Sequence, residues 1–263
     1  PWRFRPKKKN MWQPCCDGQA AGGRMREMST IAENLASVQA RIVAACTQAG
    51  RPLASVRLLA VSKTHGPEAV REAAACGQVL FAENRVQEAA AKIPECPGHL
   101  QWHLIGHLQS NKAALAARLF DWVHSVDSAK LLETLDRQAA EAGRTLNVLV
   151  QVNVSGELSK SGLPPGDVLP VLELGNRLHH VQIQGLMTIP PLTEDAEKAR
   201  PCFRKLRELR DSWACQTGLD LAELSMGMTH DMAVAVEEGA TVVRVGTGIF
   251  GVREVPATGA NET

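Results

Sequence analysis

Eight short apolar runs alternate with helical patterns along this chain, and this alternation constrains the fold more than any other feature. The runs cover residues 56–61, 79–82, 100–108, 122–126, 146–154, 181–189, 224–228 and 241–249. Apolar runs joined through helices predict parallel strands buried on both faces. Eight such strands with seven intervening helices predict an α/β fold of the (β/α)8 TIM barrel type. A doubly wound open sheet is the alternative, weakened because no Gly-x-Gly-x-x-Gly follows an early strand.

One further helix is expected ahead of the barrel. Ser29 begins its pattern, and apolar residues then recur at helical spacing: Ile31, Leu35, Val38, Ile42 and Ala45. We expect a single domain over residues 28–254, with a disordered leader at 1–27 and a disordered tail at 255–263. The basic leader is interpreted as an expression leader or a start assigned too far upstream. A targeting or nucleic-acid-binding arm is the alternative.

Charge and cysteine content limit the class of partner and the compartment. The chain has 29 basic and 28 acidic residues, so no overall field favours nucleic acid and a small anionic ligand fits better. Its seven cysteines are odd in number and contain no Cys-x-x-Cys pair, which indicates free thiols in a reducing cytoplasm. No apolar run approaches the roughly 20 residues that span a bilayer. We expect a soluble monomer.

The first apolar run stops close to Lys63, where the end of a barrel strand would carry site residues. A lysine at the mouth of an apolar barrel is expected to be partly desolvated. Desolvation favours the neutral amine, which attacks aldehydes to form a Schiff base. The alternative is that Lys63 simply marks the solvated end of a strand.

The turns after the seventh and eighth strands have the composition of a phosphate site. The first contains Gly227 and Thr229, and the second contains Gly246 and Thr247. The last two turns of a barrel often hold a phosphate through backbone amides. Thr229 could equally be an ordinary helix N-cap. Arg244 interrupts the apolar eighth strand and so needs a partner, and a guanidinium facing a heterocyclic nitrogen would keep that nitrogen unprotonated.

Several ordered motifs together resemble the pyridoxal phosphate homeostasis (YggS/PROSC) family. They are Ala-Val-Ser-Lys at 60–63, Phe-Ala-Glu-Asn at 81–84, Gln-Trp-His-Leu-Ile-Gly at 101–106, Leu-Gln-Ser-Asn-Lys at 108–112, Ser-Lys-Ser-Gly at 159–162, Gly-Leu-Met at 185–187, Leu-Ser-Met-Gly-Met at 224–228 with Asp-Met at 231–232, and Val-Arg-Val-Gly at 243–246 with Ile-Phe-Gly at 249–251. The resemblance covers residues from about 28 to 254. It implies a barrel like the alanine racemase N-terminal domain, which binds pyridoxal 5'-phosphate (PLP) as an internal aldimine.

The resemblance also implies a role for each motif residue. Lys63 would carry PLP covalently, and Arg244 would face the pyridine nitrogen. Asn84 would line the ring site. The remaining residues expected to bind the cofactor, mainly at its phosphate, are Met228, Thr229, Gly246 and Thr247. Lys160 is a candidate second lysine near the mouth.

The sequence departs from the family pattern at a few positions. Ala82 stands where glycine is usual, and its methyl group could crowd the ring or have no effect. His107 replaces a common proline, and Thr229 replaces serine but keeps the hydroxyl. His230 after it is either a helix-start residue or a ligand contact. Glu83 could orient Asn84 or a lysine, or merely begin the next helix.

No metal site is expected. His103 and His107 lack the accompanying ligands that metals need, and we interpret both as polar residues of the barrel mouth.

Three functions remain open at this point. The first is a PLP carrier that acts in vitamin B6 and amino-acid homeostasis, possesses no defined reaction and hands PLP to apo enzymes. The second is a PLP-dependent racemase or weak transaminase. Racemases of the related fold use a tyrosine from an added C-terminal domain, whereas this chain contains no tyrosine and few residues after Gly251. The third is a barrel that binds another phosphorylated metabolite.

Overall fold

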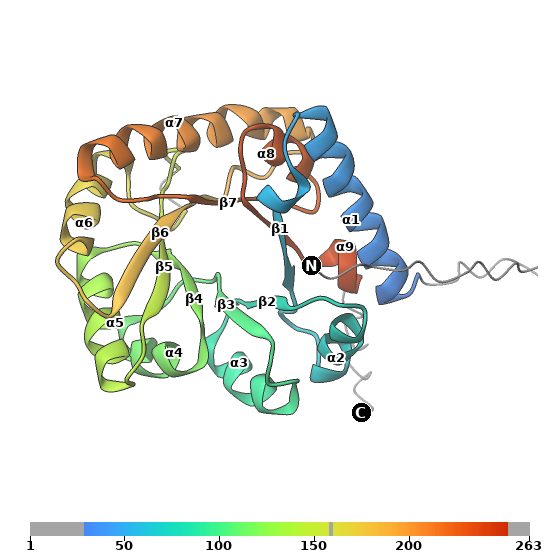
Figure 1. Cartoon of the computed structure of the whole chain (residues 1–263), viewed down its shortest axis with the longest axis horizontal. Helices are drawn as coiled ribbons and strands as arrows, with labels where there is room; N and C mark the ends of the chain where they lie inside the picture. The colour runs from blue at the N-terminus through green and yellow to red at the C-terminus, as the bar shows by residue number, and fades with distance from the viewer. Residues whose placement is uncertain (1–28, 158–159, 252–263) are drawn as a thin grey trace, which may run out of the picture.

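The barrel is closed, and every neighbouring pair of its strands is parallel. In this computed structural model, described over residues 29–157 and 160–251, the strands follow one another in chain order around the barrel (Figure 1). They are β1 (Arg57–Val61), β2 (Leu80–Glu83), β3 (Gln101–Leu104), β4 (Trp122–Val126), β5 (Leu146–Gln151), β6 (Val181–Met187), β7 (Glu223–Met228) and β8 (Val242–Val245). Because β1 pairs with both β2 and β8, the sheet has no open edge. The predicted (β/α)8 barrel is confirmed, and the doubly wound sheet is excluded.

Helices surround this barrel on the outside (Figure 1). They are α1 (Ile31–Gln48), α2 (Pro67–Ala75), α3 (Val86–Lys92), α4 (Ala113–Leu119), α5 (Ala129–Glu141), α6 (Val168–Gly175), α7 (Arg200–Thr217), α8 (Met232–Glu237) and α9 (Thr247–Phe250). Short 3-10 turns are η1 (Leu53–Ser55), η2 (Ile93–Glu95), η3 (Ser110–Lys112), η4 (Pro165–Asp167) and η5 (Ala196–Ala199). The extra helix α1 packs mainly against α8 and α9, beside the end of the barrel sequence.

Strand β1 shows why its sequence is apolar at almost every position. Leu59 and Val61 lie in one buried cluster with Ala82 and Val242, while Ala60 belongs to the larger cluster formed with the helices. The two faces of the strand are therefore buried against different partners. This arrangement is expected for a parallel strand covered on both sides.

Helix α1 begins one residue later than the sequence pattern indicated. The N-cap is Thr30, whose hydroxyl accepts a hydrogen bond from the amide of Glu33 at 3.2 Å. The Glu33 carboxylate in turn accepts from the Thr30 amide at 2.9 Å. This reciprocal pair is a capping box, and it satisfies two amides that the helix leaves free.

Four predicted strands extended too far at their carboxyl ends. β3, β5, β6 and β8 end at Leu104, Gln151, Met187 and Val245, whereas apolar residues continue beyond them. Some of those residues, including Ile105 and Ile189, line a cavity above the barrel, so they are apolar for a reason other than strand pairing. After β8 the chain turns at Gly246 and forms α9, a short helix that the sequence pattern did not predict.

The expected leader at 1–27 and tail at 255–263 lie outside the described residues. Within the described part of the chain, no helix is both long and apolar enough to cross a membrane.

Candidate functional site

Lys63 lies in the turn that follows β1, as the sequence predicted. Its side chain is exposed and lines the cavity. Among the described residues, no hydrogen bond or ion pair holds its ammonium group. The next residue, Thr64, has φ of 68°, and is the one non-glycine residue in the described chain with positive φ. The amide of Thr64 donates to the Glu88 carboxylate at 2.5 Å, which fixes this unusual turn.

A buried ion pair supports the residue in front of Lys63. The ammonium of Lys92 contacts the Glu83 carboxylate at 2.6 Å and donates to the backbone carbonyl of Ser62 at 2.8 Å. The Ser62 hydroxyl donates to the same Glu83 oxygen at 2.7 Å. Burial raises the pKa of Glu83, although Lys92 and Ser62 oppose this shift. Glu83 therefore orients Lys92 and Ser62, which decides between the roles left open for it.

The turn after β7 depends on a glycine. Gly227 has φ of 89°, and a Cβ atom there would lie 2.5 Å from the Cβ of Ala235. The following amide, that of Met228, donates to the Asp231 carboxylate at 2.5 Å. Asp231 is the N-cap position of α8, so the N-cap alternative for Thr229 is wrong. The Thr229 hydroxyl is consequently available to the cavity.

The turn after β8 meets this first turn. The hydroxyl of Thr247 lies 3.4 Å from that of Thr229. A Cβ atom on Gly246 would lie 3.3 Å from the backbone oxygen of Val61, and one on Gly248 would lie 2.9 Å from Thr229. Small residues thus leave room for two hydroxyl groups and the backbone to face one ligand.

Helix α1 holds the turn after β7 and helix α9 from outside. The guanidinium of Arg41 donates to the carbonyl of Thr229 at 2.8 Å, and the amide group of Asn34 donates to the carbonyl of Ile249 at 2.9 Å. Sequence reasoning missed these supporting residues. Their only signal was a polar position on an amphipathic helix, and such positions are usually solvated.

Arg244 extends from β8 and is buried, with 4% of its surface exposed. Its Nη1 donates to the hydroxyl of Ser225 at 2.7 Å, and its Nη2 donates to the carbonyl of Thr188 at 2.9 Å. Burial lowers the pKa of its guanidinium to about 10, and the nearby Asp231 carboxylate opposes this shift. Within the described residues, Arg244 has no salt bridge. It is a buried cation whose contacts are neutral.

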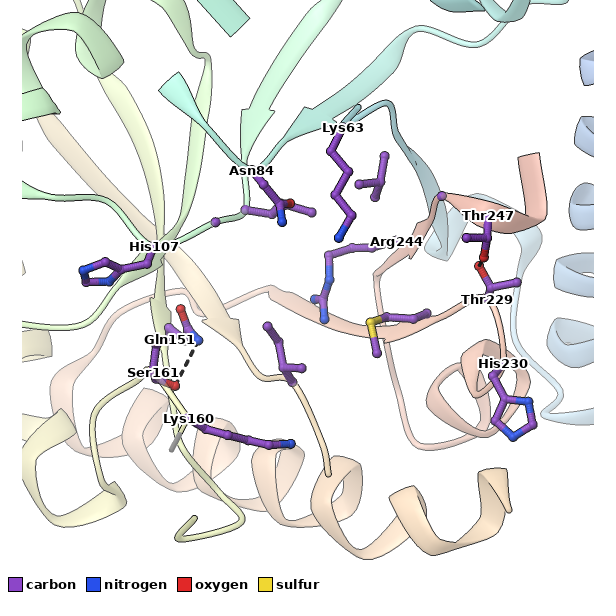
Figure 2. A pocket seen from close by; sticks show the side chains of 16 residues that line it. Lys63, Asn84, His107, Gln151, Lys160, Ser161, Thr229, His230, Arg244 and Thr247 are labelled. Atoms are coloured by element: carbon purple, nitrogen blue, oxygen red, sulfur yellow. Dashed lines mark hydrogen bonds between the residues drawn. The ribbon is translucent and has the colours of Figure 1, made fainter. Parts of the chain in front are cut away.

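One cavity of about 580 Å³ brings the predicted site together. Lys63 and Arg244 extend into the same space, with Thr229 and Thr247 on one side and Asn84 on another (Figure 2). All seven residues expected to bind a cofactor line it: Lys63, Asn84, Met228, Thr229, Arg244, Gly246 and Thr247.

The two residues of open role, Lys160 and His230, line this cavity too. The ammonium of Lys160 donates to the carbonyl of Pro190 at 2.6 Å. Nε2 of His230 lies 2.7 Å from the carbonyl of Glu194.

The cavity also contains residues that sequence reasoning did not select. Gln151 ends β5, and its amide donates to the carbonyl of Ser161 at 3.0 Å. Its place at the carboxyl end of a barrel strand was the signal that could have revealed it. Ala82 does not line the cavity, because it is buried with Leu59 and Val61. Its extra methyl group therefore packs inside the barrel.

The interpretation of His103 as a residue of the barrel mouth is wrong. Its side chain is 1% exposed inside the barrel, where it stacks on Trp122 with a ring distance of 5.5 Å. His107 is exposed and lies 3.1 Å from Asp127. In the described residues, no group of three potential ligands is arranged to bind a metal.

Known proteins share both the sequence and the fold of this chain. The family described as alanine racemase, N-terminal domain, matches residues 31–254. A pyridoxal phosphate homeostasis protein of Pseudomonas aeruginosa is 48% identical over 231 residues, which cover 88% of this chain and 99% of that protein. The chain belongs to the pyridoxal phosphate homeostasis protein family. The resemblance carried by the motifs is thereby confirmed.

Solved structures agree with this assignment. PipY of Synechococcus elongatus, solved with PLP bound, is 45% identical with a TM-score of 0.75, covering 84% of this chain and all of that one. An alanine racemase of Clostridium difficile is 15% identical with a TM-score of 0.66, covering 86% of this chain and 58% of that one. The likeness to the racemase shows the fold alone.

Proposed function

We propose that this chain binds PLP through a covalent bond to Lys63 and acts in intracellular PLP and amino-acid homeostasis, without a catalytic reaction of its own. The observation that carries the proposal is the shared cavity. An unpaired lysine amine, a buried guanidinium and two threonine hydroxyls face one space of about 580 Å³. This set matches a ligand that has an aldehyde, a ring nitrogen and a phosphate. The names of the relatives support the same ligand.

Lys63 would hold the cofactor. PLP supplies an aldehyde and, with a protonated ring, an electron sink. The neutral amine of Lys63 forms a bond to the aldehyde carbon, and the carbonyl oxygen leaves as water. The anchoring of Thr64 by Glu88 and of Ser62 by Glu83 keeps the lysine turned toward the cavity.

The two turns after β7 and β8 would hold the phosphate. The hydroxyls of Thr229 and Thr247 are close enough to donate to one phosphate group. Gly246 allows the backbone to approach it, and Met228 provides an apolar wall. Asn84 lines the opposite side, where it can contact the substituents of the ring.

Arg244 supports a carrier more than an enzyme. A guanidinium remains protonated at neutral pH, so it can only donate to a ring nitrogen, which then stays unprotonated. An unprotonated ring is a weak electron sink, which slows reactions at the amino-acid α-carbon. The chain also contains no tyrosine to act as the second acid or base of a racemase.

We further propose a cytoplasmic location and transfer of PLP to apo enzymes. Free cysteines support the location, because Cys46, Cys76, Cys96, Cys202 and Cys215 are unpaired. The exposed side chain of Lys63 supports transfer, because an acceptor lysine of another protein can approach the same carbon.

Absorbance spectroscopy with borohydride reduction tests the proposal. The purified chain incubated with PLP should gain a visible absorption band, and the reduced adduct should map to Lys63. Lys63→Ala should lose the band, because the attacking amine is gone. Lys112→Ala, a lysine outside this cavity, is the matched control and should keep it.

Two other outcomes would contradict the proposal in different ways. An adduct that maps to Lys160 would move the attachment to the second lysine of the cavity. A chain that stays colourless with PLP would leave a barrel that binds some other phosphorylated metabolite.

A further inference from the structure

A chain of buried polar side chains runs from Arg244 into the barrel. Nη1 of Arg244 donates to the Ser225 hydroxyl at 2.7 Å, and that hydroxyl lies 3.0 Å from Nδ1 of His124. Nε2 of His124 lies 2.9 Å from Nδ1 of His103. The four residues come from β8, β7, β4 and β3, and none is more than 4% exposed. The chain thus connects the cavity with the closed interior of the barrel.

Both histidines are neutral in this setting. Burial lowers the pKa of His103 to about 3, with a smaller contribution from Arg57. Burial also lowers the pKa of His124 well below its usual value, assisted by the neighbouring His103, Arg244 and Arg57. A neutral imidazole has one N–H donor and one acceptor nitrogen. Each ring therefore accepts a hydrogen bond at one nitrogen and donates one at the other, which gives the series of hydrogen bonds a single direction.

The hydrogen-bond partners decide that direction. If the Ser225 hydroxyl donates to Nδ1 of His124, then Nε2 of His124 carries a proton and donates to Nδ1 of His103. One buried group is then left over, the Nε2–H of His103, and this atom has no partner in the described structure. In the reverse direction the Ser225 proton would also lack an acceptor. The first direction leaves fewer unsatisfied groups, so it is favoured.

We propose that Ser225 and His124 are positioning residues, which hold the Arg244 guanidinium toward the ring nitrogen of the bound cofactor through a hydrogen-bond chain directed from Ser225 to His103. This inference rests on the proposed function. With its proton committed to His124, the Ser225 oxygen presents a lone pair to Arg244. The carbonyl of Thr188 fixes the second guanidinium nitrogen at 2.9 Å. The remaining N–H groups of Arg244 are left for the cavity.

Nitrogen NMR of the imidazole rings tests the direction of the hydrogen-bond chain without any cofactor. In the full-length, unsubstituted protein, both His103 and His124 should carry their proton on Nε2. Ser225→Ala should shift the Nδ1 signal of His124, because that nitrogen loses its donor. Ser125→Ala is the matched control, since Ser125 is equally buried but donates to the carbonyl of Gly106. A proton on Nδ1 of His124, or an unmoved signal in Ser225→Ala, would overturn the proposed direction.

Paired ligands test the positioning role. Pyridoxine 5'-phosphate lacks the aldehyde, so its affinity does not depend on a bond to Lys63, and its benzene analogue lacks the ring nitrogen. The unsubstituted chain should prefer the pyridine, and Ser225→Ala should reduce this preference about tenfold, as expected for the loss of a hydrogen bond to a charged group. Ser125→Ala should retain the preference. A merely structural effect would weaken both ligands equally and leave the ratio unchanged, which would overturn the role.

Two substitutions of His124 give a second, independent pair of variants. His124→Asn can keep an acceptor for Ser225 and should retain the ligand preference, whereas His124→Leu should lose it. Equal affinities in the unsubstituted chain would overturn the ring contact in the proposed function and the positioning role with it. The NMR result would still decide the direction of the chain, and the borohydride result would still decide whether Lys63 binds PLP.

Discussion

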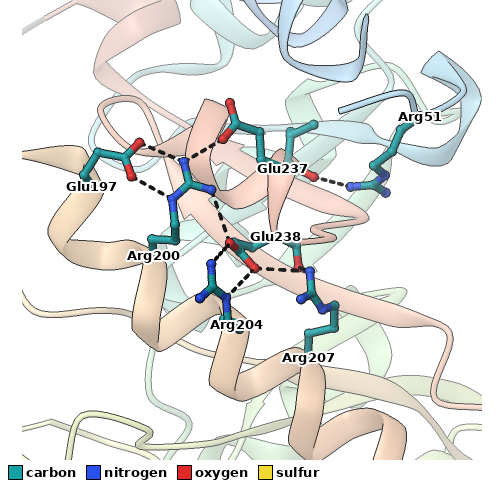
Figure 3. A network of polar contacts seen from close by, with 8 residues as sticks. Arg51, Glu197, Arg200, Arg204, Arg207, Glu237 and Glu238 are labelled. Atoms are coloured by element: carbon teal, nitrogen blue, oxygen red, sulfur yellow. Dashed lines mark hydrogen bonds and ion pairs between the residues drawn. The ribbon is translucent and has the colours of Figure 1, made fainter. Parts of the chain in front are cut away.

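Arg200 and Arg244 meet opposite surroundings in the same barrel. On α7, Arg200 contacts three carboxylates, those of Glu197, Glu237 and Glu238, at distances from 2.6 to 3.2 Å (Figure 3). On β8, Arg244 contacts a serine hydroxyl and a backbone carbonyl. The first cation is neutralised within the protein and joins helices. The second lacks a salt bridge in the described residues, so a ligand can complete its surroundings.

Glu238 is the centre of the first cluster. Its buried carboxylate also contacts Arg204 at 2.9 Å and Arg207 at 3.1 Å. Burial opposes its ionisation, yet hydrogen bonds from Arg204 and Arg200 keep the pKa of Glu238 below its usual value. The cluster that we call the Arg200 network, Arg200, Arg204, Arg207, Glu197, Glu237 and Glu238, is therefore expected to contribute stability and no binding.

Removal of Glu238 should have the largest effect. Glu238→Ala leaves three arginines without a shared partner, and we expect a loss of about 3 kcal/mol in the free energy of unfolding. Urea unfolding at pH 7 measures this loss, while the adduct with PLP should still form. Glu237→Ala is the control, because among the described residues this carboxylate forms an ion pair only with Arg200, and its loss should cost about 1 kcal/mol. Equal losses in both variants would break the assignment of Glu238 as the centre.

The hydrogen-bond chain of Arg244 and the Arg200 network should lose stability in different ranges of acidic pH. Because His103 stays neutral in the folded protein while the unfolded chain takes up a proton below pH 6.5, stability is complete above pH 6.5 and falls as pH decreases toward 3. The pKa of Glu238 is lowered from the ordinary glutamate value of 4.5, so the stability that this carboxylate contributes is lost only as pH falls below 4.5. From pH 6.5 to 5, protonation of the His103 ring in the unfolded chain should therefore lower the free energy of unfolding by about 1.6 kcal/mol.

A substitution of His103 checks that assignment. His103→Asn can still accept from His124 but does not titrate, so its free energy of unfolding should decrease less between pH 6.5 and 5. His179→Asn removes an exposed histidine and should keep the full decrease. An undiminished decrease in His103→Asn would contradict the neutral state of this ring.

Removal of Arg244 should change stability least. Arg244→Met loses two hydrogen bonds, but it also removes a buried cation that lacks a salt bridge, so the free energy of unfolding should change by less than about 1 kcal/mol. The same variant should lose the preference for pyridine over benzene ligands. Arg200→Met should do the reverse, with lower stability and an unchanged preference. A drop in stability as large as that of Glu238→Ala would end the distinction between the two arginines.

The sequence was sufficient for the architecture and for the residues at strand ends. Apolar runs with helical connections predict parallel strands, and their number favours a closed barrel over an open sheet. The rule that strand ends carry the site located Lys63, whereas Arg244 was singled out as a charge within the apolar eighth strand. The residues at which strands end were less predictable. Ile105 and Ile189 prolong two apolar runs, but they line the cavity and are not part of the sheet. The exposure of the Lys63 side chain could not be predicted from the sequence either, because it depends on the distances between the surrounding turns.

Interactions between distant strands were not predictable. His124 lies 101 positions before Ser225, and although Ser225 belongs to the Leu-Ser-Met-Gly-Met motif at 224–228, no local pattern links it to His124. Their partnership arises only when the barrel closes. The same holds for Arg41, whose contact with Thr229 joins the first helix to a turn 188 positions away.

The pairing of β1 with β8 has a consequence for the synthesis of the chain. Leu59 on β1 lies opposite Arg244 on β8, and Lys63 follows β1. While the ribosome is still making the barrel, β1 lacks its second neighbour, and the guanidinium that faces the cavity does not exist. A nascent chain therefore carries the lysine before it has a place for the rest of the ligand. We therefore expect the complete cavity for PLP to form only once the last strand has emerged.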